Sequence, residues 1–160
     1  MFRVAFLLCT TFLASSCFAQ DEQDTLLKRC PIFITDTVSS NNFFIEALPA
    51  TVKVDRIKGD LTVVVQQRDQ FFTIFFGEKK LRSGKYSIKP NAKNKHEAIA
   101  KYSFKSGDQV SYINVANGTI EASFDEATEL WRLLISGTIA NVVERNVSYY
   151  RVRGELFLKD

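Results

Sequence analysis

The chain has 160 residues, and its 21 Lys and Arg residues nearly balance 18 Asp and Glu residues. This length suits one domain that buries about two-thirds of the surface of the unfolded chain. The near-neutral balance gives no general electrostatic reason to expect nucleic-acid binding. Of the three cysteines, Cys9 and Cys17 lie in or beside an N-terminal apolar segment, which leaves Cys30 without a partner for an internal disulfide.

The N-terminal segment has the order of a secretory signal. One positive charge at Arg3 is followed by the apolar run Val4–Leu13 and then by small or apolar residues up to Ala19. We expect cleavage after Ala19, which makes residues 1–19 a signal peptide. The protein is therefore expected to be exported, to the periplasm, the outer-membrane surface or the extracellular space.

A second interpretation of this segment is lipidation at Cys17. The residues Leu13–Cys17 resemble the lipobox of bacterial lipoproteins, in which the cysteine carries the lipid. That modification would anchor the protein to a membrane without changing its fold. In either case residues 20–29 are expected to form a polar tether, and residues 30–160 a single domain.

Short strands are expected at the start of the domain. Cys30–Asp36 has the character of a first strand, with Pro31 favouring a strand start or a sheet edge. Phe43–Leu48 is apolar and stops at a proline. Thr51–Ile57 alternates valines with charged residues and is expected to be a half-exposed strand.

The strongest strand signal is the hairpin formed by Leu61–Gln66 and Phe71–Phe76. The second run holds four phenylalanines in six residues, and polar residues 67–70 join the two runs. We expect this hairpin at the centre of a sheet. Phe75 and Ile135 are expected to be core residues.

The next strands follow from alternation and turn chemistry. Tyr86–Lys89 is a brief strand, and Ala98–Lys105 alternates apolar with polar residues. Val110–Val115 and Thr119–Phe124 flank Asn117-Gly118, and Asn-Gly tolerates positive φ at both turn positions. A β-hairpin centred on Asn117-Gly118 is therefore expected.

The last part of the domain contains one ambiguous segment, Asp125–Ser136. Asp125 could cap a helix, but the apolar and β-branched residues that follow favour one long strand over Glu129–Val143, bulged at Gly137. Val147–Leu158 is expected to close the sheet, with a second bulge at Gly154.

Many short strands at this spacing indicate an all-β fold, an antiparallel β-sandwich or alternatively a lipocalin-like β-barrel. Four short motifs also occur in a familiar order: Gly84-Lys-Tyr86, Asn117-Gly-Thr-Ile120, Leu134-Ile-Ser-Gly-Thr-Ile139 and Gly154-Glu-Leu-Phe157. On these motifs, the chain from Leu61 onward resembles a family of small uncharacterised secreted proteins and lipoproteins typical of Bacteroidetes. The resemblance implies a compact antiparallel β-sandwich and brings no catalytic residues.

Catalytic and metal-binding residues are not expected. His96 is the only histidine, and no Gly-x-Ser-x-Gly elbow accompanies the serines. Asp125, Glu126 and Glu129 place three carboxylates in five residues, but without the spacing of a calcium loop. We predict no enzyme activity, no metal and no cofactor.

Binding residues are expected in the segment Lys79–Lys105, which holds nine basic residues and only Glu97 as an acid. Loops at one end of the sheet could gather these charges into a site for an anionic partner. A sheet that keeps lysines on its wet faces and edges would explain them equally well. The candidate binding residues are Lys79, Lys80, Arg82, Lys85, Lys93 and Lys95. A sugar-stacking platform of Trp131, Tyr149 and Tyr150 is a further hypothesis, although Trp131 shares the strand face of core residues.

The sequence therefore predicts an exported, non-enzymatic binding or structural module of the cell envelope. Its partner would be an envelope protein or an anionic glycan or lipid, and not a nucleic acid. Two alternatives stay open: a lipocalin-like carrier of an apolar ligand, and a hydrolase with an unrecognised site for which His96 is the available base.

Overall fold

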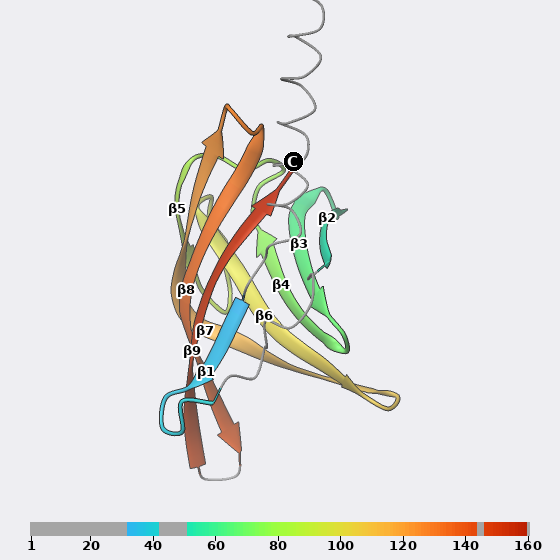
Figure 1. Cartoon of the computed structure of the whole chain (residues 1–160), viewed down its shortest axis with the longest axis vertical. Coiled ribbons are helices and arrows are strands. Elements are labelled where there is room, and N and C mark those ends of the chain that lie inside the picture. Colours follow the sequence, from blue (N-terminus) through green and yellow to red (C-terminus); the bar gives the residue numbers. More distant parts are fainter. Residues whose placement is uncertain (1–31, 42–50, 144–145, 160) are drawn as a thin grey trace, which may run out of the picture.

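The computed structural model of the chain describes residues 32–41, 51–143 and 146–159 (Figure 1). The expected signal peptide, Cys17, the tether, Cys30 and the apolar run Phe43–Leu48 lie outside these residues. The described part contains nine strands and no helix: β1 (Ile32–Asp36), β2 (Thr51–Ile57), β3 (Asp60–Gln67), β4 (Gln70–Phe76), β5 (Gly84–Ile88), β6 (Glu97–Ser106), β7 (Gln109–Asp125), β8 (Leu130–Val143) and β9 (Asn146–Leu158).

All nine strands belong to one sheet, in the order β1-β9-β8-β7-β5-β6-β4-β3-β2, which curls into a half-barrel (Figure 1). The all-β prediction is confirmed. The curled single sheet lies between the two architectures considered above, because it neither divides into two separate sheets nor joins its edge strands β1 and β2. One pairing is parallel: Ser87 and Ile88 of β5 lie opposite Glu97 and Ala98 of β6, so the sheet is mixed.

The hairpin of β3 and β4 is confirmed, with Gln67 opposite Gln70 and a two-residue turn at Arg68 and Asp69. Arg68 takes a φ of 54°. The hairpin does not lie at the centre of the sheet, however, because only β2 follows β3 before the edge. The charges of Lys53, Asp55 and Arg56 on this edge strand oppose the addition of further strands.

The hairpin expected around Asn117-Gly118 is wrong, because β7 runs through these residues without turning back. Its first part pairs with β6, and residues from Gly118 onward pair with β5. The register against β8 shifts between Val115 and Asn117, which places a bulge in β7 and not at Gly137. The irregular backbone that Asn-Gly permits is used here to redirect a strand between two neighbours.

The segment Asp125–Ser136 contains no helix: β7 ends at Asp125, a turn follows, and β8 begins at Leu130. The expected long strand is thus confirmed. The bulge expected at Gly154 is absent, because Gly154 pairs in regular register with Ile135 on one side and Ile32 on the other.

The core lies on the inner face of the curved sheet, where alternate residues of each strand are buried. On β4 these are Phe72, Ile74 and Phe76, each at most 1% exposed. Ile135 is a core residue as expected, and Trp131 packs against the core. Phe75 is not part of this cluster: it belongs to the outward, half-buried face of β4, and the Lys101 Nζ lies 5.6 Å from its ring centroid.

Candidate functional site

Two loops that carry predicted binding residues pack against each other at one end of β4. We call residues 77–83 and 89–96 together the basic loops. The His96 amide donates a hydrogen bond to Glu78 Oε1 at 3.3 Å. The buried Tyr86 lies under both loops: its hydroxyl accepts a hydrogen bond from the Arg82 amide at 2.9 Å, and its ring centroid is 5.5 Å from that of His96. The topology therefore joins two segments that the sequence separates.

Glu97 organises the second of these loops. Its buried carboxylate accepts hydrogen bonds from the Lys89 ammonium, from the Lys93 amide at 2.9 Å and from the Asn94 amide at 3.1 Å. These donors, with Lys89 first, lower the pKa of Glu97 from 4.5 to about 2. The ionised carboxylate is thus a structural centre for the loop.

This pKa predicts how stability changes with acid. Because the pKa of Glu97 is about 2 in the folded protein and about 4.5 unfolded, its contribution is complete above about pH 4.5 and is lost as the pH falls towards 2. Glu97→Gln should lower the melting temperature at pH 7 and flatten its decline between pH 5 and pH 2. Glu121→Gln, which removes an exposed carboxylate, is the control. An unchanged decline in Glu97→Gln would contradict this role.

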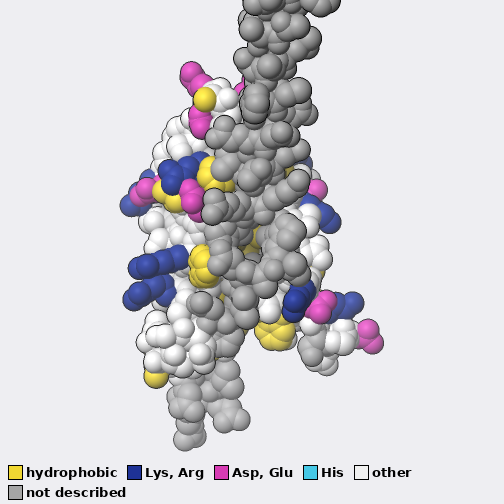
Figure 2. Space-filling model, in the orientation of Figure 1, with side chains coloured by type: hydrophobic (Ala, Val, Ile, Leu, Met, Phe, Trp, Pro, Cys, Tyr) yellow, Lys and Arg dark blue, Asp and Glu magenta, His cyan; other side chains and the backbone are white. Residues whose placement is uncertain are grey.

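Within the basic loops the cations divide into paired and unpaired groups. Arg82 pairs with the buried Glu78, with Nε 3.1 Å from Oε2. Lys85 lies apart on β5, where its ammonium is 3.7 Å from Glu121 Oε1 on β7. Among the described residues no carboxylate pairs with the four remaining candidates, which are all exposed: Lys79, Lys80, Lys93 and Lys95. On the face in Figure 2, several basic side chains lie beside acidic ones.

The other residues considered from the sequence do not come together. His96 is exposed, with a φ of 63°. The Asp125 carboxylate accepts the Ala127 amide at 2.9 Å and so closes the turn before β8. No group of three or more metal-ligating His, Cys, Asp or Glu side chains occurs within the described ranges.

The sugar-stacking platform is likewise not formed. Tyr149 and Tyr150 lie opposite Ala140 and Ile139, whereas Trp131 lies opposite Leu158, much further along β8. Trp131 instead contacts Phe124 of β7, with ring centroids 5.3 Å apart. The sequence pattern shows which face of a strand a residue belongs to. It does not show that Trp131 and the two tyrosines lie at distant positions along β8 and β9.

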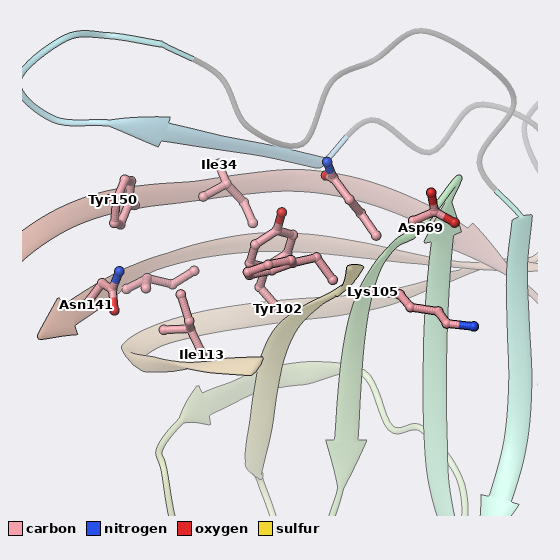
Figure 3. Close-up of a pocket in the computed structure, with 10 residues that line it drawn as sticks. Ile34, Asp69, Tyr102, Lys105, Ile113, Asn141 and Tyr150 are labelled. Atoms are coloured by element: carbon pink, nitrogen blue, oxygen red, sulfur yellow. The ribbon is translucent and has the colours of Figure 1, made fainter. Parts of the chain in front are cut away.

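A groove on the inner face of the half-barrel is the site that sequence reasoning missed. Its volume is about 560 Å³, within the range of about 300–1,000 Å³ typical of small-molecule sites. In Figure 3, Asn141 and Tyr150 lie towards one end and Asp69 and Lys105 towards the other. Its apolar lining comes from five strands: Ile34, Tyr102, Phe104, Ile113, Ile139 and Tyr150.

One polar side chain of this groove lacks a partner. Gln70 lines the groove at the start of β4, and its Oε1 is buried without a hydrogen-bond donor from any described residue. Burial in the groove also raises the pKa of the Tyr102 hydroxyl. The alternation of β6 did indicate that Tyr102 and Phe104 face inward, but alternation carries no information about the space in front of them.

In the described ranges, no helix has the length and apolar character needed to cross a membrane. Comparisons of the chain with models of known protein families, with curated proteins and with solved structures gave no significant match. The resemblance to secreted Bacteroidetes proteins therefore stays a prediction from short motifs, and the function has to be argued from the site itself.

Proposed function

We propose that this protein is an exported, non-enzymatic binding module of the cell envelope, and that its basic loops hold an anionic partner. The observation that carries the proposal is the arrangement of Lys79, Lys80, Lys93 and Lys95 on two mutually packed loops, where no carboxylate of the described residues forms an ion pair with them. Export is inferred from the N-terminal sequence.

The buried carboxylates support this function because they fix the loops from inside. Glu78 joins the two loops, and Glu97 binds the backbone of the second loop. Lysines on a loop held in one conformation lose less conformational entropy on binding than lysines on a loop that must first become ordered. The partner chemistry that fits is phosphate or carboxylate on an envelope lipid or glycan, since Lys binds such groups as a point charge.

The test is sedimentation with vesicles of phosphatidylglycerol, compared with vesicles of phosphatidylcholine. We expect binding to the anionic vesicles only, weakening several-fold when the salt is raised from about 50 to about 300 mM. Each lysine near an anionic surface contributes about 1 kcal/mol, so Lys79→Gln with Lys93→Gln should weaken binding roughly thirtyfold.

The matched control removes two cations elsewhere. Arg151 and Arg153 are exposed on β9, so Arg151→Gln with Arg153→Gln makes the same change in net charge outside the basic loops. Equal weakening by both double variants would show attraction by net charge alone and would reject the proposed site. Binding that does not depend on salt would also reject it.

A further inference from the structure

We propose that the groove on the inner face of the half-barrel binds an uncharged amphipathic small molecule. The ligand would place an apolar, flat or branched body against Tyr102, Phe104 and Ile113, and a hydrogen-bond donor against Gln70 Oε1. This site is independent of the basic loops, because Gln70 begins β4 whereas the first basic loop follows Phe76 at its other end.

The apolar body is inferred from the contrast between the groove and the core beside it. Further along the same strands, Phe72, Ile74 and Ala100 are fully buried and closely packed. Protein interiors are normally filled to the density of organic crystals, and unfilled apolar volume destabilises the fold. The groove, in contrast, opens to solvent and keeps six apolar side chains on its walls, and its volume of about 560 Å³ suits a small-molecule ligand.

The shape of the lining favours a planar or branched group. The rings of Tyr102 and Phe104 lie 6.0 Å apart at 33°, and both line the groove together with the aliphatic side chains of Ile113 and Ile139. Aromatic faces and isoleucine side chains offer broad apolar contact area. The walls come from strands far apart in the sequence, since Ile34 belongs to β1 and Ile139 to β8.

The hydrogen-bond donor is inferred from Gln70. It continues the inward-facing series of Phe72, Ile74 and Phe76, so a polar side chain occupies a position with core orientation. Its buried Oε1 has no partner in the part of the chain that the structure describes, and an unsatisfied buried acceptor costs about 1–3 kcal/mol of stability. A ligand N–H or O–H group would satisfy it once the Gln70 amide turns towards the groove.

The lack of net charge is inferred from Asp69 and Lys105. They line the same end of the groove, and the Lys105 amide donates a hydrogen bond to the Asp69 carbonyl at 2.8 Å. One acidic and one basic side chain together give no preference for an anion or a cation. The groove thus selects a different ligand chemistry from the four unpaired lysines of the basic loops.

The test uses N-phenyl-1-naphthylamine, an uncharged aromatic probe with one N–H donor whose fluorescence rises in apolar surroundings. Titration of the purified protein should give a saturable increase with one site per chain. Ile113→Trp, which fills the groove, should weaken binding at least tenfold. Val110→Trp places the same side chain at an exposed position on the same strand and should bind as the wild type does.

Gln70→Leu tests the hydrogen bond and separates binding from structure. Removing the unpartnered acceptor should keep or raise the melting temperature, and it should weaken binding of the probe about three- to tenfold. The compound 1-phenoxynaphthalene lacks the N–H group. Its dissociation constant, measured by displacement of the probe, should be nearly the same in the wild type and in Gln70→Leu.

Two results would overturn the proposal: no saturable binding by the wild type, or equal binding by wild type and Ile113→Trp. A loss in Gln70→Leu that is the same for both compounds would reject the hydrogen bond. The Lys79→Gln, Lys93→Gln double variant should bind the probe normally, so failure of this site and failure of the basic loops are distinguishable.

Discussion

Gly118→Ala should destabilise the protein by about 3 kcal/mol or more, because an added Cβ would meet the backbone of the neighbouring strand. At the position of that atom, Ser136 O would be 2.3 Å away and Gly137 Cα 2.6 Å away. Backbone cannot move aside as a flexible side chain can, so β7 and β8 would have to separate locally. Urea unfolding at pH 7 measures the loss.

Gly107→Ala is the control for this substitution. Gly107 also has a positive φ, of 61°, but no atom of the described residues lies within 4 Å of its added Cβ. Backbone strain alone should cost about 1 kcal/mol there. If the two variants were equally stable, the close approach of β7 to β8 would not be the reason that glycine is needed at position 118.

Phe72→Ala should cost about 3–5 kcal/mol, since the ring is fully buried in the core and its loss leaves a cavity. Phe75→Ala, three residues later on the outward face of the same strand, should cost about 1–2 kcal/mol. Thermal or urea unfolding of the pair measures the difference directly. Equal losses would mean that the inner and outer faces of β4 are assigned wrongly.

Strands with clear alternation could be predicted from the sequence because their signal is local. Residues 98–103 alternate in burial on β6 as they do in sequence, and the residues of β3 and β4 form the expected hairpin. The structural role of Gly118 is harder to predict from the sequence. Asn117-Gly118 has the chemistry of a tight turn and of a bulge alike, and only the pairing of β7 with three neighbours decides between them.

The basic loops and the groove also differ in how far the sequence alone could predict them. A cluster of lysines in two loops is visible in the sequence, whereas their mutual packing depends on Glu78 and Tyr86, which the charge pattern does not single out. The groove could not be predicted, because its volume depends on the distance between walls from β1, β6 and β8. The sequence pattern places Gln70 in the turn between the two runs, and its inward orientation follows only once the hairpin register is known.

The pairing of β1 with β9 has a consequence for the order of folding. β1 is the first described strand, yet the one described strand that it pairs with is the last, with Ile32 opposite Gly154. Bringing together two strands so far apart in the sequence costs more conformational entropy than pairing the strands of a hairpin, and it is therefore slower. During synthesis β1 can therefore pair only after β9 has been made. Until β9 pairs with β8, the edge of β8 stays exposed, and strands of other chains can add to it.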